Sequence, residues 1–129
     1  MLRLVIMLTI LTFILLLLGF DNNEIPVIVT AYSPRVQETD STPFLGSCGN
    51  VYEGSIAVSR DMFPIDSQTF SKPSCNRIVV LIFNDGTRQR FIVRDTMNKR
   101  YRRRVDIFIL NTSDALHFGI QKATLIWTD

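Results

Sequence analysis

The sequence predicts an all-β domain, a small closed barrel of about six strands with one short helix. Short apolar runs of strand length alternate with turn signals along most of the chain. A single stretch near the C-terminus is typical of a helix, and it is short. The length of 129 residues suits one domain and little else.

The first apolar run, residues 4–20, is a membrane or signal segment that precedes the barrel. It contains no charged residue, and its 17 residues would span about 25 Å as a helix. Arg3 lies before it and Asp21 and Glu24 lie after it, so the positive-inside rule puts the N-terminus in the cytoplasm. No Ala-x-Ala cleavage site follows, which favours an uncleaved signal anchor over a signal peptide. A buried core helix is a third alternative.

We therefore expect two units, a signal anchor or signal peptide over residues 1–22 and the barrel domain over residues 25–129. An anchor makes the chain a single-pass protein of the cell membrane, with its C-terminal domain outside the cytoplasm. A cleaved signal peptide instead makes the domain a secreted protein.

The strands of the barrel are bounded by turn residues. Asn84-Asp85-Gly86 predicts a tight hairpin turn. The run before it is continuously apolar after Arg77, which predicts a strand covered on both faces. Asn111–Asp114 resembles a helix N-cap, and Gly119 ends a helix expected over residues 114–118. The expected strands cover residues 25–32, 51–59, 77–83, 88–95, 103–110 and 120–128, and residues 33–50 form a loop.

Composition and charge exclude several classes of function. Hydrophobic residues make up 47% and charged residues 20%, which excludes a disordered chain. Fourteen basic and 12 acidic residues are too evenly balanced for a general polyanion binder. One histidine and two cysteines cannot supply the four ligands of a structural zinc site, which excludes such a site. We also expect no other metal and no cofactor.

The basic run of residues 99–104 can be interpreted in several ways. A nucleic-acid patch is one interpretation, but an exported domain meets no nucleic acid. A solvated loop is another, and a contact with anionic wall polymer or phospholipid headgroups is the third. The two cysteines, Cys48 and Cys75, also leave two alternatives. They form a disulfide in an oxidising compartment, or they are free thiols too far apart to pair.

Asp95 and Asp106 are the candidate chemical groups, eleven residues apart and each at the end of or inside an apolar strand. Strand alternation puts Asp106 on one face with Phe108. A carboxyl group among apolar neighbours has a raised pKa, which suits a general acid near neutral pH. The alternative is a structural aspartate that pairs with Arg94 or Arg104.

Five short segments recur in an order and spacing that resemble the three-aspartate (3D) domain family. They are Val29–Tyr32, Gly54–Val58, Asp95-Thr96, Arg104–Phe108 and Ala115–Gly119. This family is a double-psi β-barrel, as in membrane-bound lytic transglycosylase A and related bacterial cell-wall proteins. The chain departs from the family pattern at two places. Ser59 replaces an aspartate, and Met97-Asn98 replaces a Gly-Gly pair.

The resemblance implies a double-psi β-barrel that cleaves the β-1,4 bond between N-acetylmuramic acid and N-acetylglucosamine in peptidoglycan glycan strands, without a metal or cofactor. Asp106 would be the single general acid/base, which protonates the glycosidic oxygen and then accepts a proton from the muramyl 6-hydroxyl. Asp95 would orient the sugar or tune Asp106. The alternative function is a non-catalytic cell-wall or saccharide-binding or assembly module on the same barrel. The candidate substrate-binding residues are Thr30, Tyr32, Thr96 and Arg104.

Overall fold

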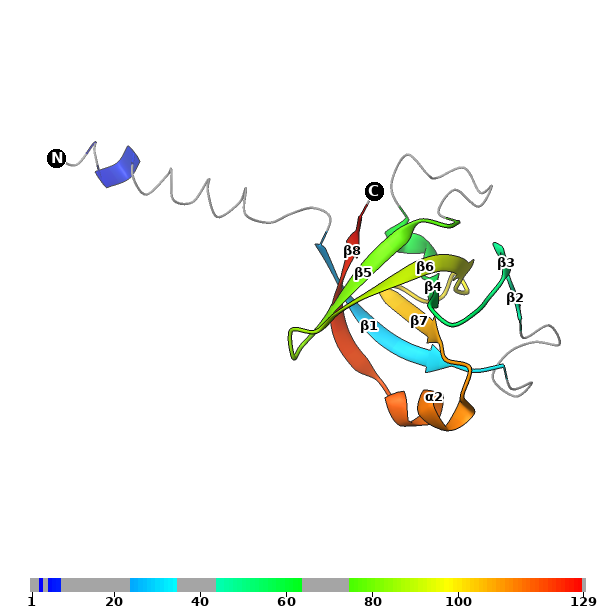
Figure 1. The fold of residues 1–129 in the computed structure, drawn as a ribbon. Coiled ribbons are helices and arrows are strands. Elements are labelled where there is room, and N and C mark those ends of the chain that lie inside the picture. Colours follow the sequence, from blue (N-terminus) through cyan, green and yellow to red (C-terminus); the bar gives the residue numbers. More distant parts are fainter. Residues whose placement is uncertain (1–2, 4, 8–23, 35–43, 64–74, 129) are drawn as a thin grey trace.

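A computed structural model of the chain describes residues 3, 5–7, 24–34, 44–63 and 75–128 (Figure 1). The predicted membrane segment, residues 4–20, lies almost entirely outside these ranges. Within them, no helix has the length and hydropathy that a membrane crossing requires.

The described residues form a closed barrel of six strands, as predicted, with one short helix beside it (Figure 1). Neighbouring strands follow the order β1-β7-β4-β6-β5-β8 around the barrel. Two of the pairs, β1 with β7 and β4 with β6, are parallel, and the other four pairs are antiparallel. The bounds are β1 Glu24–Tyr32, β4 Ser55–Val58, β5 Ile78–Phe83, β6 Arg88–Thr96, β7 Arg104–Phe108, α2 Thr112–Phe118 and β8 Gln121–Trp127.

The barrel interior is filled by alternate residues of the strands, which is the period-two pattern of a half-buried sheet. Val29, Leu81, Val105 and Leu125 are fully buried in one hydrophobic cluster. Full burial of such a side chain contributes about 1.5–3 kcal/mol to folding. The intervening residues of each strand therefore point outward, and the candidate site is built from them.

Three local predictions need correction. The first is β4, which begins at Ser55 rather than Val51, because Gly54 has a φ of 94° and the Ser55 backbone N–H bonds back to the carbonyl of Tyr52. The helix α2 begins at Thr112, because the Asn111 side chain accepts a hydrogen bond of 3.0 Å from the backbone N–H of Asp114.

The third correction concerns β5, which we expected to be covered on both faces. Val79 and Leu81 are fully buried, whereas Val80 and Ile82 on the other face are partly exposed. The strand pairs antiparallel with both β6 and β8, so its outer face lies at the surface of the barrel. The hairpin turn between β5 and β6 is confirmed, with a φ of 88° at Gly86.

The predicted loop of residues 33–50 contains a small hairpin. Its strands are β2 (Leu45–Gly46) and β3 (Gly49–Asn50), which pair antiparallel with each other. The hairpin lies beside β6, apart from the barrel sheet (Figure 1). A backbone hydrogen bond of 3.1 Å from Cys48 N–H to the carbonyl of Arg94 ties the hairpin to β6.

Candidate functional site

Four residues on neighbouring strands are register partners and form one row across the outside of the barrel. Asp95 of β6 is opposite Ala57 of β4, Ala57 is opposite Asp106 of β7, and Asp106 is opposite Thr30 of β1. We call these four residues the carboxylate row. Register partners on paired strands share a face of the sheet, so this row gathers residues from four separate stretches of the sequence.

The two carboxylates of the row flank the small side chain of Ala57. Adjacent strands lie about 4.8 Å apart, so the Cα atoms of Asp95 and Asp106, two strands apart, are separated by roughly 9–10 Å. Ala57 lies between them and is buried, and its side chain is a single methyl group. The polar groups of this part of the row are therefore the two carboxylates.

A register shift brings Asp95 into the row. Ile56 is opposite Val93, but the next residue of β4, Ala57, is opposite Asp95, so Arg94 is skipped. Simple alternation from Val93, which faces the core, would turn Asp95 inward. The register shift instead turns the Asp95 side chain to the outer face. Shifts of this kind, β-bulges, often redirect side chains next to functional sites.

Asp106 lies on the outer face of β7, as the alternation predicts. Its neighbours Val105 and Ile107 belong to the core cluster. The Thr30 hydroxyl donates a hydrogen bond of 3.0 Å to Oδ1 of Asp106. The site thus brings together two residues that the sequence analysis selected separately, 76 positions apart.

The Tyr32 side chain completes the site. Burial, and then the negative charges of Asp95 and Asp106, raise the pKa of its hydroxyl well above the usual value. The group therefore stays a neutral O–H donor near both carboxylates. Its oxygen is buried, and no described residue forms a hydrogen bond with it. Buried polar groups in folded proteins normally have a partner, so this donor is an exception among the described residues.

Aromatic rings connect Tyr32 with the surface. The Tyr32 ring meets the edge of Phe108 at a centroid distance of 5.3 Å, and Phe44 meets Phe108 at 6.2 Å. Phe108 is 2% exposed, whereas Phe44 is 50% exposed. Phe44 is therefore the exposed end of a series of ring contacts that begins at Tyr32.

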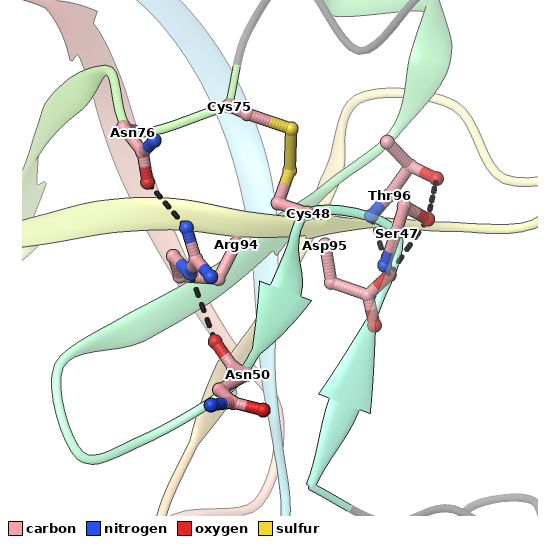
Figure 2. The surroundings of a disulfide bond; sticks show 8 residues. All are labelled: Ser47, Cys48, Asn50, Cys75, Asn76, Arg94, Asp95 and Thr96. Carbon is pink, nitrogen blue, oxygen red and sulfur yellow. Dashed lines mark hydrogen bonds between the residues drawn. A yellow bond between two sulfur atoms is a disulfide. The ribbon is translucent and has the colours of Figure 1, made fainter.

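The described residues hold Asp95 through one of its two carboxylate oxygens. Oδ1 accepts hydrogen bonds from the backbone N–H and the hydroxyl of Ser47, at 2.8 and 3.0 Å, and from the backbone N–H of Thr96, at 2.8 Å (Figure 2). Within the described ranges, no residue donates to Oδ2. The Thr96 hydroxyl itself bonds the Ser47 hydroxyl at 2.9 Å, so Thr96 supports the carboxylate through Ser47.

The arginine that precedes Asp95 is engaged elsewhere. The Arg94 Nε donates a hydrogen bond of 2.8 Å to the carbonyl of Asn50, and its Nη1 donates to the side chain of Asn76 (Figure 2). Cys48 and Cys75 form a disulfide with a Cα–Cα distance of 5.5 Å, which is the first of the two alternatives. These contacts hold the β2–β3 hairpin against β6.

Arg104 lies two positions before Asp106, at the start of β7. Its guanidinium lies 5.1 Å from the ring centroid of Tyr101, and the guanidinium of Arg100 lies 4.8 Å from the same centroid. The Arg104 Nε is buried, and none of the described residues bonds to it. Arg104, the last residue of the basic loop, therefore lies one side-chain repeat from Asp106 along the same face of β7.

The structure adds residues that the sequence analysis missed. Ala57 is visible as a site residue only from the register of three strands. Ser47 has no signal in the sequence beyond its position next to Cys48. Groups of three or more His, Cys, Asp or Glu that could hold a metal ion do not occur among the described residues.

Comparison with known proteins identifies a fold but no family. A scan against family models gives no match, and a search of curated proteins gives none either. Among solved structures, the apo expansin of Clavibacter michiganensis matches with a TM-score of 0.54 and 16% sequence identity, covering 82% of this chain and 50% of that chain. A point mutant of a Clavibacter michiganensis expansin in complex with cellohexaose matches with a TM-score of 0.53 and 15% identity, with the same coverage.

The barrel has an expansin-like, double-psi-like fold. At 15–16% identity this likeness concerns the fold alone, and the chain spans half the length of the expansins it matches.

Proposed function

We propose that this chain binds a cell-wall polysaccharide across the carboxylate row, and that the glycan strands of peptidoglycan are its ligand. Saccharides present hydroxyl groups that both donate and accept hydrogen bonds, together with apolar ring faces. The row offers carboxylate acceptors at Asp95 and Asp106, and the neighbouring Tyr32 offers a donor. Phe44, which is half exposed and packs against the buried Phe108, supplies an aromatic surface.

One observation carries this proposal. The Tyr32 hydroxyl is buried near two carboxylates and forms no hydrogen bond with the described residues. A buried polar group without a partner costs about 1–3 kcal/mol of stability. The Tyr32 hydroxyl therefore destabilises the fold, and a ligand hydroxyl that accepts a hydrogen bond from it would remove this cost.

The comparisons add support from the fold. A solved expansin of the same barrel type is in complex with cellohexaose, a chain of sugars. The matched region is half of that expansin, and the outer face of β7 with Asp106 is the surface to which we assign polysaccharide binding in this chain.

Co-sedimentation with purified peptidoglycan tests the proposal. The full chain is kept in detergent micelles because of its apolar N-terminal segment, and bound protein is measured against glycan concentration. We expect Asp95→Asn and Asp106→Asn each to weaken binding roughly tenfold, the usual effect of losing a hydrogen bond to a charged group. The matched control is Asp114→Asn, an exposed carboxylate on α2, which should bind like the wild type.

Failure of the wild type to sediment with the glycan would refute the proposal. Equal binding by the wild type and both row variants would refute the assignment of the site while leaving an interaction elsewhere on the chain.

A second candidate function, lytic transglycosylase cleavage, is favoured by the position of Asp106. Its carboxyl group is partly buried, accepts a hydrogen bond from Thr30 and lies near the protonated Tyr32 hydroxyl. On this proposal Asp106 donates a proton to the glycosidic oxygen as the bond to the anomeric carbon breaks. It then accepts the proton of the muramyl 6-hydroxyl as that oxygen bonds the anomeric carbon.

Mass spectrometry of the soluble products separates the two functions. Cleavage predicts 1,6-anhydro-muramyl fragments from the wild type and none from Asp106→Asn. Binding without cleavage predicts that no fragments appear with either protein while the wild type still sediments. Fragments with a free reducing end would show hydrolysis instead of transglycosylation.

We also propose membership of the 3D domain family and export of the barrel on a single N-terminal anchor. The five matching segments in order support the family, and the uncharged run of residues 4–20 supports the anchor. Protease treatment of intact cells tests the topology. Digestion of a C-terminal tag from outside the cell is expected, and full protection of the tag would contradict this topology.

A further inference from the structure

The Asp95 carboxylate is held in place by an element outside the barrel sheet. Ser47, at the tip of the β2–β3 hairpin, supplies two of the three donors to Oδ1, its backbone N–H and its hydroxyl. Thr96 supplies the third through its backbone N–H. Three donors on a single oxygen fix the orientation of the carboxyl group and leave Oδ2 pointing away from them (Figure 2).

The hydroxyl groups form a directed chain. The Ser47 hydroxyl has one proton, and the carboxylate can only accept, so this proton goes to Asp95. The Thr96 hydroxyl must then donate to the Ser47 oxygen, across 2.9 Å. Each hydrogen bond polarises the next one, so the Ser47 hydroxyl is a stronger donor to Asp95 than it would be alone.

The hairpin needs an anchor, because each of its strands has only two residues. A short two-stranded hairpin is marginally stable by itself in water. The disulfide joins Cys48, the residue after Ser47, to Cys75, three positions before β5 begins, and so binds the tip covalently. Arg94 bridges the two sides through Asn50 and Asn76, so the tether and the hydrogen bonds meet at β6 (Figure 2).

We propose that Ser47 is a positioning residue, which holds the Asp95 carboxylate so that Oδ2 faces the ligand, and that the Cys48–Cys75 disulfide keeps Ser47 there. This inference rests on the proposed function, because it assigns ligand contact to Asp95. It extends that function to a part of the chain that lies outside the barrel sheet, and it assigns a role to the disulfide beyond stability.

A double-mutant cycle tests the role of Ser47. We expect Ser47→Ala to weaken glycan binding roughly five- to tenfold in the wild-type background and to have no effect in the Asp95→Asn background. Ser47→Thr keeps both donors and should restore binding. Ser113→Ala, which removes an exposed hydroxyl from α2, is the matched control and should leave binding unchanged.

The disulfide is tested by the paired variant Cys48→Ala with Cys75→Ala. We expect a barrel that still folds, judged by its amide spectrum, and glycan binding weakened to the level of Ser47→Ala or below. If this variant does not fold, the cycle with Ser47→Ala still decides the positioning role of Ser47, because that variant retains the disulfide.

The outcomes separate the two proposals. If the wild type does not bind, both the proposed function and this inference fail. If the wild type binds and Asp95→Asn weakens binding, the proposed function stands. Unchanged binding by Ser47→Ala, or an equal loss in both backgrounds, then overturns the positioning role. A folded disulfide-free variant that binds like the wild type overturns the role of the tether.

Discussion

Gly46 allows the hairpin to lie directly on the Asp95 carboxyl group, so a single methyl group at this position should dislodge it. A Cβ at Gly46 would lie 2.7 Å from the carbonyl oxygen of Arg94 and 2.7 Å from Cγ of Asp95. Ordinary van der Waals contact begins at 3.4 Å, so the hairpin must retreat by about 0.7 Å. The Ser47 N–H to Asp95 bond, now 2.8 Å, would lengthen to roughly 3.5 Å, beyond the normal hydrogen-bond range.

We therefore expect Gly46→Ala to lower the free energy of unfolding by about 1–3 kcal/mol and to weaken glycan binding roughly tenfold. The measurements are urea unfolding and co-sedimentation with peptidoglycan. The matched control is Gly86→Ala in the distant β5–β6 turn. There no atom lies within 4 Å of the added Cβ, but the φ of 88° makes alanine costly by about 1–2 kcal/mol.

We expect Gly86→Ala to lose about as much stability as Gly46→Ala but to bind the glycan like the wild type. This result would separate the effect on the site from a general loss of stability. Binding by Gly46→Ala within twofold of the wild type would show that the hairpin does not need to lie this close to Asp95.

Four further predictions concern the rest of the fold. Removing both Cys48 and Cys75, which are 27 positions apart, should lower the free energy of unfolding by about 3.5 kcal/mol, measured by urea titration. Leu125→Ala, at a fully buried core position, should cost about 2–5 kcal/mol in the same assay. Tyr32→Phe removes a buried hydroxyl without a described partner, so the free energy of unfolding should rise by about 1–3 kcal/mol while glycan binding falls roughly fivefold. In the wild type, Tyr32 keeps its proton in the folded state above the pH near 10 where the unfolded chain loses it. Stability should therefore fall as the pH rises above 10, and less steeply in Tyr32→Phe.

The local alternation of the strands could be predicted from the sequence, and with it the position of Asp106. Val105 and Ile107 face the core and Asp106 faces outward, because side-chain direction in a regular strand depends only on the residue's place in the alternation. The pairing of Thr30 with Asp106 follows from the parallel contact of β1 and β7, which no local pattern reveals.

The position of Asp95 could not be predicted by alternation. Phe91 and Val93 face the core, so a regular strand would point Asp95 inward as well. The register shift opposite Ala57 reverses this direction, and it arises from the pairing of β6 with β4. The row itself exists only through that nonlocal register.

The hairpin and the disulfide were beyond prediction for a related reason. Strands of two residues are too short to show an alternation of apolar and polar residues, so the sequence of β2 and β3 does not differ from that of a loop. The sequence left Cys48 and Cys75 either paired or too far apart, because the distance between two loops is set by the whole barrel. The predicted anchor and its location stay predictions, because residues 4–20 lie almost entirely outside the described ranges.

The most direct test of the binding row is an amide chemical-shift titration of the full-length, ¹⁵N-labelled chain in detergent micelles with soluble peptidoglycan glycan fragments. We expect the largest shifts at Thr30, Tyr32, Ala57, Asp95 and Asp106, with little change at the β5–β6 turn. A saturable titration whose largest shifts lie elsewhere on the barrel, or no shifts at all, would contradict the central claim.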